Sequence, residues 1–368
     1  MKEYKSGRAE MSRDSRREAG PEVLTSRDNR WLKEFRVALR GGVPTGNGAV
    51  GVEGARLVEE ALTSGCRVEA VLFSESGERY RERLAPLIAR PEMGFPVLKT
   101  TDRLFEGIAD TEHPQGVAAL VVPREWTLED LISGEWEEEK STAEAQRAQS
   151  YAEKAPAGPA AIPPLRPQTA RPPVGMTGES GTEAALIVVL AGVQDPGNVG
   201  TILRTAAAFG ATGAVTAATG QSGTASPFAP KALRASAGAA LHLPIVSGMA
   251  LGILLTQLKL RGIRTLASCV EEEKSPGAKP APGAPGPRTA TEAMAPWEVD
   301  WRQPIALLVG NEGAGLPEEI VRAADARVRI PMAALPSSGR GRVESLNAGA
   351  AAAVVLYEAY RQRKKKRV

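Results

Sequence analysis

Two runs of consecutive apolar residues, ALIVVLAGV at 185–193 and IALLVG at 305–310, constrain the fold of this chain more than any other feature. Neighbouring residues of a strand point to opposite faces, so a strand that is apolar throughout must be covered on both faces. Such strands are typical of a parallel sheet with helices on either side. The sequence therefore predicts an α/β fold with a parallel sheet in this half of the chain.

Helix and strand patterns alternate between and after these two runs, as expected for βαβ units. Gly210 and Gly262 stand where two helices are expected to end, because glycine readily adopts the left-handed conformation that closes a helix. The expected helices are 201–211, 230–241, 251–262 and 343–363, and the expected strands are 213–217, 243–246 and 263–269.

A smaller α/β pattern precedes this half. Residues 56–65 have the spacing of an amphipathic helix, and 68–73 and 116–122 are short apolar runs expected to form buried strands. Segments rich in acid, proline or alanine separate the two patterns and interrupt the second. We expect a disordered leader at 1–21, a small domain at 22–123, a low-complexity linker or insertion at 124–183, and a second domain at 184–368 with a Pro/Gly-rich insertion at 272–297 and a basic tail at 361–368.

Composition excludes several classes of protein. Apolar residues make up 42% and charged residues 24% of the chain, as in ordinary globular proteins. The two cysteines, Cys66 and Cys269, are far apart and lack metal-ligand partners at a suitable spacing, which favours a reducing cytoplasm and no metal. No apolar stretch approaches the ~20 residues of a membrane span, so we expect a cytoplasmic protein without a membrane partner.

Positive charge gathers in the basic tail, although the net charge is only +3. RQRKKKRV at 361–368 holds six basic residues and no acid, which suits contact with nucleic acid phosphates. A solvated segment that maintains solubility explains the same run equally well. The aromatic share of 4% argues against an aromatic stacking platform for RNA bases.

The first group of residues suited to chemistry follows the apolar run at 185–193. Residues 195–197 (DPG) are turn formers, and Asn198 is expected to cap the next helix. Arg204, in that helix, presents a planar guanidinium that suits RNA phosphate or a ribose hydroxyl. Open α/β folds bind ligands at the carboxyl ends of their strands, where this segment lies. A plain strand-turn-helix junction with an exposed arginine remains the alternative.

Two further groups follow in the sequence. LLVGNEGAGL at 307–316 places three glycines after a buried strand, and this lets the backbone approach a ligand closely or simply forms a turn. Asn311 and Glu312 are the polar side chains of this loop. Ser345 and Asn347 precede an alanine-rich helix, where they contribute to a site or only cap the helix.

The order and spacing of these segments resemble a known family. NVGTILRTAAAFGA, LLVGNEGAGL, and IPM followed by ESLNAGAAAAVVLYEAYRQR resemble motifs 1, 2 and 3 of the SpoU or TrmH-like (SPOUT) RNA 2′-O-ribose methyltransferases. TSRDNRWLK, GVEGARLVEEAL and IADTEHPQGVAALV resemble the family's small RNA substrate-binding domain, and this identifies 22–123 as such a domain. The resemblance covers roughly residues 25–122 and 185–363.

The resemblance implies particular roles for residues of the three motifs. The motif 1 arginine of the family is held to activate the ribose 2′-hydroxyl, and the motif 1 asparagine to support the substrate. The methyl donor contacts backbone around the motif 2 glycine, the residue before the Pro-Met pair and the motif 3 leucine. The implied catalytic residues are Arg204, Asn198, Glu312, Ser345 and Asn347, and the implied cofactor-binding residues are Gly310, Ile330 and Leu346.

The same resemblance implies S-adenosyl-L-methionine as the cofactor, no metal, and a homodimer with the cofactor near the interface. The implied fold is a SPOUT-like α/β parallel sheet with a carboxyl-terminal trefoil knot, preceded by a small ribosomal-protein L30e-like α/β domain. A ribose hydroxyl is a poor nucleophile near neutral pH, so a cation that stabilises the developing alkoxide would assist a base that takes the proton.

The chain departs from the family pattern beside the expected cofactor pocket. AALPSSGRGR at 333–342 is an insertion that can displace Ile330, and its Arg340 and Arg342 are candidates for RNA contact. The predicted function is S-adenosylmethionine-dependent methylation of a ribose 2′-hydroxyl in structured RNA, with rRNA favoured over tRNA. A tRNA 2′-O-methyltransferase and a non-catalytic RNA-binding or ribosome-assembly protein on the same fold are the alternatives.

Overall fold

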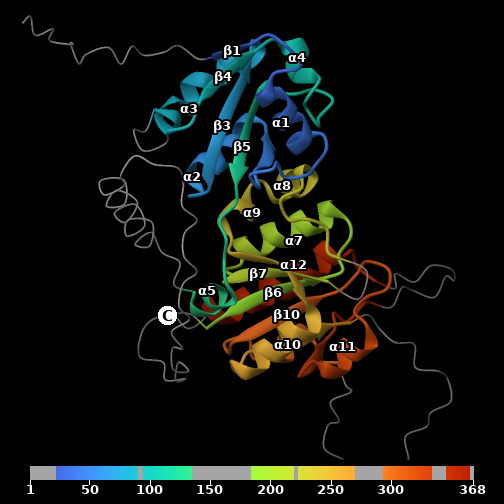
Figure 1. Cartoon of the computed structure of the whole chain (residues 1–368). Helices are drawn as coiled ribbons and strands as arrows, with labels where there is room; N and C mark the ends of the chain where they lie inside the picture. Colours follow the sequence, from blue (N-terminus) through green and yellow to red (C-terminus); the bar gives the residue numbers. More distant parts are fainter. Residues whose placement is uncertain are drawn as a thin grey trace, which may run out of the picture.

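The computed structural model describes residues 22–89, 94–134, 184–218, 223–269, 293–333 and 345–364, which form two α/β units stacked one above the other (Figure 1). The leader expected at 1–21 lies outside these residues, as do most of the expected linker and both candidate arginines, Arg340 and Arg342. Among the described residues, no helix combines the length and the apolarity needed to cross a bilayer.

The amino-terminal unit contains a mixed sheet, with the strand order β1-β4-β3-β5-β2 in the part of the chain that the structure describes. Only β5 runs antiparallel to its neighbours in this sheet as described. The elements are β1 (Glu22–Leu24), α1 (Arg30–Leu39), β2 (Val50–Glu53), α2 (Ala55–Thr63), β3 (Arg67–Ser74), the 3-10 helix η1 (Ser76–Tyr80), α3 (Arg81–Ile88), β4 (Val97–Thr100), α4 (Asp102–Glu106) and β5 (Val117–Val122).

The carboxyl-terminal unit contains a sheet whose described strands are all parallel, in the order β11-β9-β10-β6-β7-β8. This arrangement confirms the predicted parallel α/β sheet. The elements are α5 (Leu128–Ser133), β6 (Leu186–Ala191), α7 (Pro196–Ala208), β7 (Gly213–Ala218), α8 (Pro230–Ser236), α9 (Ala239–His242), β8 (Ile245–Ala250), α10 (Leu251–Leu260), β9 (Arg264–Ser268), the 3-10 helix η2 (Pro296–Glu298), β10 (Ile305–Val309), α11 (Glu318–Ala323), β11 (Ala326–Val328) and α12 (Ala348–Lys364).

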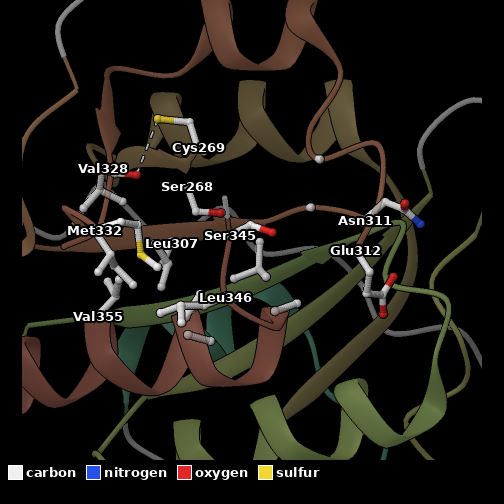
Figure 2. A pocket seen from close by; sticks show the side chains of 17 residues that line it. Ser268, Cys269, Leu307, Asn311, Glu312, Val328, Met332, Ser345, Leu346 and Val355 are labelled. Atoms are coloured by element: carbon white, nitrogen blue, oxygen red, sulfur yellow. Dashed lines mark hydrogen bonds between the residues drawn. The ribbon is translucent and has the colours of Figure 1, made fainter. Parts of the chain in front are cut away.

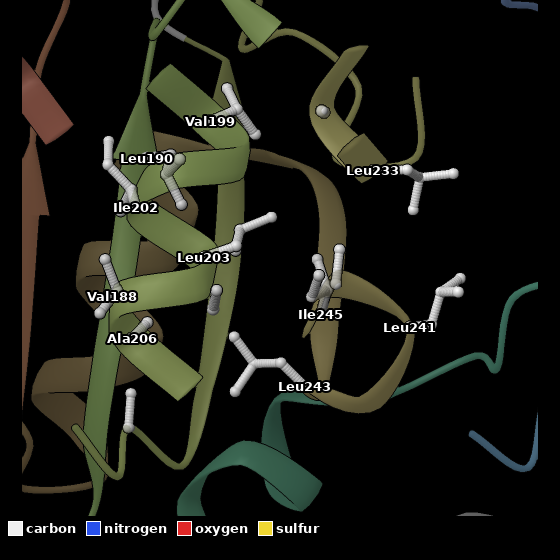
Figure 3. Packing of buried hydrophobic residues seen from close by; sticks show 14 of the residues in the cluster. Val188, Leu190, Val199, Ile202, Leu203, Ala206, Leu233, Leu241, Leu243 and Ile245 are labelled. Carbon is white, nitrogen blue, oxygen red and sulfur yellow. The ribbon is translucent and has the colours of Figure 1, made fainter. Parts of the chain in front are cut away.

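Strand β6 shows why its sequence is apolar at every position. Leu186, Val188 and Leu190 pack beneath α7, α8, α9 and α12 (Figure 3). Ile187 and Val189 point to the opposite face, where α5, α10 and α11 cover them. All of these side chains are fully buried, so the sheet forms the middle layer between two sets of helices. Helix α5 belongs to this unit although it lies within the segment 124–183 expected as a linker.

The helix expected at 230–241 is in fact two helices, α8 and α9. Ala237 and Gly238 separate them with positive φ angles of 50° and 87°. A Cβ atom at Gly238 would lie 2.8 Å from Glu60 Cβ on α2, so the sharp break lets α9 pack closely against the amino-terminal unit. The prediction of one helix was wrong because this break depends on a contact between distant parts of the chain.

Two helices begin elsewhere than predicted. The helix expected at 201–211 begins at Pro196, because Asp195 and not Asn198 is its N-cap. The helix expected from 343 begins at Ala348, because Asn347 Oδ1 accepts a hydrogen bond from Gly349 N at 2.9 Å and thereby caps it. Both differences concern residues of the candidate site.

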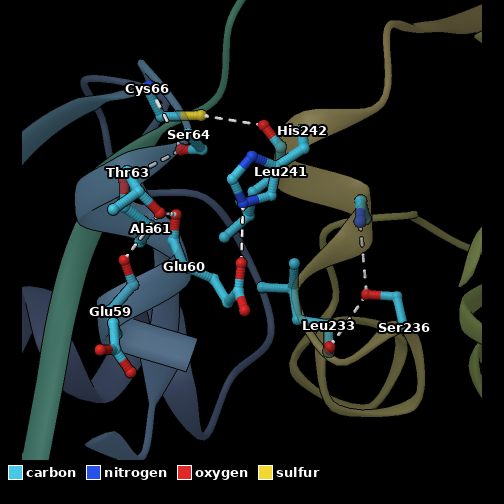
Figure 4. Close-up of polar contacts among 11 residues, drawn as sticks. Glu59, Glu60, Ala61, Thr63, Ser64, Cys66, Leu233, Ser236, Leu241 and His242 are labelled. Atoms are coloured by element: carbon cyan, nitrogen blue, oxygen red, sulfur yellow. Dashed lines mark hydrogen bonds and ion pairs between the residues drawn. The ribbon is translucent and has the colours of Figure 1, made fainter. Parts of the chain in front are cut away.

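The two units share one continuous hydrophobic core, to which β2, β3 and α2 contribute from one side and β6, α7 and α9 from the other. Polar contacts surround this seam. His242 Nε2 lies 2.9 Å from Glu60 Oε2, and the Cys66 thiol donates to Leu241 O at 3.6 Å (Figure 4). Arg234 pairs with Asp110 at 2.6 Å. The amino-terminal unit is therefore held in a defined position over α8 and α9.

The described part of the basic tail makes contacts within the protein. Arg361 forms two hydrogen bonds to the Glu358 carboxylate, each 2.7 Å long. Arg363 donates to the carbonyl oxygens of Trp301 at 2.8 Å and Gln303 at 3.1 Å, and its guanidinium also reaches Ala184 and Ala185 at the start of β6. Arg363 therefore fastens α12 to the segments that precede β6 and β10, whereas Arg361 pairs within α12 itself. Residues 365–368 lie outside the described chain.

Candidate active site

Strands β6 and β10 are parallel neighbours, so the segments that follow them lie side by side at one edge of the sheet. The segment after β6 leads into α7, and the segment after β10 forms the glycine-rich loop at 310–316. The start of α12 packs on α7, where a Cβ atom at Gly349 would lie 2.9 Å from Thr201 Cγ2. All three candidate motifs therefore meet at the carboxyl ends of the strands, where open α/β folds bind ligands.

Asp195, and not Asn198, caps α7, so the Asn198 side chain is available to the site. Asp195 Oδ2 accepts a hydrogen bond from Asn198 N at 3.1 Å, and Pro196 occupies the first position of the helix. Proline suits that position because its missing N–H would have no partner there. Since the capping duty falls on Asp195, the Asn198 amide can bind other side chains.

A chain of hydrogen bonds joins one residue from each motif. Asn347 Nδ2 donates to Asn198 Oδ1 at 2.9 Å, and Asn198 Nδ2 donates to Glu312 Oε1 at 2.9 Å. An ionised carboxylate can only accept, so Glu312 requires the Asn198 NH2 group to point toward it. The Asn198 oxygen must then face Asn347. We call Asn347, Asn198 and Glu312 the amide relay, and Glu312 sets its direction.

Glu312 is ionised at neutral pH. Partial burial raises the pKa of Glu312, but hydrogen bonds from Asn198 and from nearby backbone N–H groups outweigh this effect, so the pKa lies below its ordinary value. The backbone N–H groups of Gln194 and Asp195 each lie 3.3 Å from its carboxylate oxygens. Glu312 therefore serves as a fixed acceptor rather than as a group that exchanges protons near neutral pH.

Asn311 and the glycines give the loop at 310–316 its shape. Asn311 Nδ2 donates to Gly192 O at 3.0 Å, which ties the loop to the end of β6. Its backbone pairs with that of Gly315 in both directions at 3.0 Å. A Cβ atom at Gly310 would lie 2.4 Å from the Gly315 carbonyl carbon, so only glycine allows this close approach.

A pocket opens between this loop, β11 and the start of α12 (Figure 2). Asn311 and Glu312 lie at one end of the pocket, and Met332 and Val355 lie at the other. Its walls are mainly apolar, with polar groups at a few positions. The lining residues are Ser268, Cys269, Leu307, Val309, Gly310, Asn311, Glu312, Gly315, Val328, Ile330, Met332, Ser345, Leu346, Ala348, Ala351, Ala352 and Val355. The pocket suits a ligand with a large apolar surface and a few polar groups.

The eight predicted site residues separate into three places. Gly310, Glu312, Ile330, Ser345 and Leu346 line the pocket. Asn198 and Asn347 do not line it but belong to the amide relay, which connects to the pocket through Glu312.

Arg204 lies elsewhere, on the exposed surface of α7. Six residues separate it from Asn198, which turns it about 120° around the helix axis. Within the described chain, its guanidinium has no hydrogen bond or ion pair. The structure thus leaves one cation of the predicted set unengaged.

The sequence did not predict that Lys231 lies beside this site. It also predicted Asn198 as the N-cap of α7, whereas Asp195 is the N-cap in the structure. The signal for Asp195 is present in the sequence, because aspartate directly before a proline is a favoured helix start. Lys231 pairs with Asp195 Oδ1 at 2.5 Å, and this pair lowers the pKa of Asp195. No local pattern marks Lys231, since 36 residues separate the two partners.

Comparisons with known proteins agree with this geometry. Residues 185–357 match the model of the SpoU rRNA Methylase family, and residues 45–119 match that of the MRM3-like substrate binding domain. The 23S rRNA (guanosine(2553)-2'-O)-methyltransferase RlmP of Bacillus subtilis is 32% identical over 83% of this chain and 86% of its own length. An uncharacterized tRNA/rRNA methyltransferase of Synechocystis is 36% identical over 49% of this chain, which spans about half (54%) of that relative.

Solved structures show the same fold over nearly the whole chain. The AdoMet-bound rRNA methyltransferase from Sinorhizobium meliloti is 25% identical, with a TM-score of 0.62 over 92% of this chain and 97% of its own. The SpoU methyltransferase AviRb from Streptomyces viridochromogenes shares the fold at 23% identity, with a TM-score of 0.60 over 92% of this chain and 99% of its own. The chain therefore belongs to the SpoU rRNA methylase family.

Proposed function

We propose that this protein transfers the methyl group of S-adenosyl-L-methionine to a ribose 2′-hydroxyl in structured RNA, with rRNA as the favoured substrate. The observation that carries this proposal is that the amide relay and the pocket share Glu312. A donor held in the pocket and an acceptor hydroxyl held beside Asn198 would then meet at one place. Placing two reactants together is the main task of a methyl-transfer enzyme whose donor is already activated.

The pocket residues fit S-adenosylmethionine. Its apolar walls, with Leu307, Ile330 and Leu346 among them, suit the flat adenine ring. The ionised Glu312 at one end suits a cationic ligand. Gly310, Ile330 and Leu346 are the proposed cofactor-binding residues. When bound, the cofactor supplies an electrophilic methyl group on a positively charged sulfur.

Cys269 provides a direct test of this cofactor site, because it lines the pocket. Bound S-adenosylmethionine should slow the alkylation of Cys269 by iodoacetamide at least several-fold, as measured by peptide mass spectrometry. Cys66, at the seam between the units, is the internal control: burial raises the pKa of its thiol, and its slow reaction should not respond to the cofactor. If Cys269 reacted equally fast with and without saturating cofactor, the proposal that the cofactor binds in this pocket would be wrong.

The proposed catalytic residues act on the acceptor side. The amide relay fixes the Asn198 and Asn347 amides, each of which retains an N–H that can orient a ribose hydroxyl. The Ser345 hydroxyl lies at the pocket and can donate or accept beside them. Arg204 would stabilise the developing alkoxide, and its guanidinium has no partner within the described residues to compete for it.

An exposed apolar face on α12 supports the proposed homodimer. On α12, Val354 and Tyr357 are 44% and 53% exposed, although both are large apolar residues. Phe209, at the end of α7, stacks edge-on against Tyr357 with ring centres 5.7 Å apart, so this face is continuous with α7. A second copy covering it would bury Val354, Tyr357 and the end of α7.

A trefoil knot at the carboxyl end of the chain is also part of the proposal. The position of α12 supports it, because α12 follows β11 in the chain, yet Arg363 fastens it to the residues just before β6 and β10. The amino-terminal unit is proposed as an L30e-like RNA substrate-binding domain at 22–123, supported by its match to the MRM3-like substrate binding domain. The protein is proposed to act in the cytoplasm.

Methyl transfer can be measured with tritiated S-adenosylmethionine and three RNA substrates: 23S rRNA, 16S rRNA and bulk tRNA. We expect label in an rRNA, recovered as a 2′-O-methylnucleoside by mass spectrometry, and no label with Arg204→Ala. Arg322→Ala, on α11, is the matched control that should keep activity. Label confined to tRNA would select the tRNA alternative, and binding of rRNA without any transfer would select the non-catalytic alternative.

A further inference from the structure

Lys231 occupies a fixed position beside the amide relay. It is the second residue of α8, which packs against α7 so closely that a Cβ atom at Gly200 would lie 2.3 Å from Ala232 O. Its ammonium group pairs with Asp195 Oδ1 at 2.5 Å. Backbone contact between the two helices therefore sets the distance from which Lys231 reaches the turn before α7.

Asp195 makes three contacts with different functions. One carboxylate oxygen caps α7 through Asn198 N, and the other binds Lys231. The Asp195 backbone N–H donates to Glu312 Oε1 at 3.3 Å. A rotation of this side chain would therefore release the Asn198 backbone N–H and the Lys231 ammonium group, and it would disturb the start of α7 at Asn198.

Gly197 shows that the Lys231 side chain lies across this turn. A Cβ atom on Gly197 would lie 2.8 Å from Asp195 Oδ2 and 3.3 Å from Lys231 Cε. A larger residue at this position would therefore have to displace the Asp195 carboxylate or the Lys231 stem. Contact along the stem adds to the attraction between the two charges.

We propose that Lys231 is a positioning residue for methyl transfer: it holds the Asp195 carboxylate as the cap of α7 and so orients Asn198 in the amide relay. This inference rests on the proposed function. Lys231 and Asp195 are 59% and 42% exposed, and exposed ion pairs contribute little to the stability of a fold. The effect of Lys231 is therefore expected in the rate of transfer and not in folding.

The layout of the site predicts which kinetic constant will change. The pocket is lined by Glu312 but not by Lys231, Asp195 or Asn198. Loss of Lys231 should lower kcat, because the acceptor side becomes misaligned. It should leave the KM for S-adenosylmethionine nearly unchanged.

The first experiment measures methyl transfer to rRNA by the full-length protein. Lys231→Met should lower kcat by about 10- to 100-fold, as expected for a misplaced reacting group. Lys231→Arg, which can keep the ion pair, should recover most of this loss. Arg322→Met, which removes another exposed, ion-paired cation, from α11, should lose nothing. Lys231→Met combined with Asp195→Asn should cost no more than the larger single effect, because both disrupt one contact.

Two outcomes would overturn the inference: an unchanged kcat in Lys231→Met, or additive effects of the two substitutions. If kcat were unchanged while the KM for rRNA rose and its salt dependence weakened, Lys231 would be a phosphate contact. A wild-type protein that transfers no methyl group would instead contradict the proposed function, so the two failures are distinguishable.

Gly197→Ala supplies a second test that keeps both charges. Its methyl group should displace the Asp195 carboxylate and lower kcat, while alanine within a helix preserves folding as measured by thermal unfolding. An unchanged kcat in a folded Gly197→Ala protein would show that the carboxylate position is irrelevant to the reaction and would also overturn the inference.

Discussion

The amide relay and the seam between the two units both join segments far apart in the chain, but they do so with different chemistry. The relay consists of two amides and one carboxylate, and each of its hydrogen bonds has a fixed donor and a fixed acceptor. The seam consists of apolar side chains bordered by polar contacts such as that between Glu60 and His242. The direction of hydrogen bonds matters for a site that must orient a substrate hydroxyl. The contact between the two units depends mainly on the apolar area that it buries. Substitutions in the two regions should therefore affect different measurements.

The largest expected effect is on activity, from Glu312→Ala. Without the carboxylate the Asn198 amide loses its fixed direction, so transfer to rRNA should fall about 100-fold or more. The thermal unfolding temperature should fall far less than activity does, because the side chain is exposed and its hydrogen bonds contribute only modestly to stability. Asn198→Ala should give a similar loss. If Glu312→Ala retained full activity, the relay would not be part of the site.

Gly310→Ala should weaken both binding and folding. The added Cβ would meet the backbone of Gly315 at 2.4 Å, and a backbone atom cannot move away as a flexible side chain can. We expect a loss of about 1–3 kcal/mol in the free energy of unfolding and a weaker affinity for S-adenosylmethionine. Denaturant unfolding and calorimetry measure the two effects. Gly313→Ala, in the same loop but with only an ordinary contact at its Cβ position, 3.7 Å from Asn311 Oδ1, is the control.

Gly238→Ala tests the seam. Its φ of 87° disfavours any side chain, and the new Cβ would lie 2.8 Å from Glu60 Cβ. The free energy of unfolding should fall by about 1–3 kcal/mol, because strain and overpacking act together. Methyl transfer by the remaining folded protein should be less affected than in Glu312→Ala. Ala237→Gly, at the neighbouring position with φ 50°, adds no atom and should be neutral or mildly stabilising.

Ionisation of Glu312 should make the free energy of unfolding depend on pH in the acidic range. The hydrogen bonds of the relay hold the pKa of Glu312 below its ordinary value. Its contribution is therefore fully present above the pKa of an unfolded glutamate and is lost as pH falls through the lower, folded value. Wild type should lose more stability than Glu312→Gln across this acidic range. Parallel stability curves for the two proteins would contradict this prediction.

The smallest expected effect comes from Glu60→Gln at the seam. The Glu60 and His242 side chains are 34% and 38% exposed, and such pairs contribute at most about 1 kcal/mol once solvent screening is included. The unfolding temperature should therefore shift only slightly. A loss as large as that of Gly238→Ala would mean that charge, and not apolar packing, holds the units together.

The sequence predicted β6 and β10, the central strands of the carboxyl-terminal sheet, better than any other feature. The strand expected at 243–246 in fact spans Ile245–Ala250, and β11 was not predicted. Runs such as LIVVLA in β6 are apolar throughout because both faces are buried, and this signal is local. The break between α8 and α9 carries no such signal, since Ala237 takes a positive φ that alanine rarely adopts and Gly238 lies against Glu60 of α2, far away in the sequence.

The candidate site was predictable only in part. The family motifs named Asn198, Glu312 and Asn347, but their hydrogen bonds span 114 and 149 residues and depend on the order of strands in the sheet. The capping role of Asp195 could have been predicted from the proline that follows it. The contribution of Lys231 could not, because it depends on the close packing of α7 and α8.

Helix α12 has a consequence for the synthesis of this protein. It is translated after every other described element, yet Asn347 before it completes the amide relay and Arg363 within it binds carbonyl oxygens next to β6 and β10. A growing chain that has already made both sheets therefore still lacks Asn347 and the wall that α12 contributes to the pocket. The proposed methyl transfer is thus not expected from a nascent chain until α12 has left the ribosome, and products of interrupted translation should be inactive even when most of their core has folded.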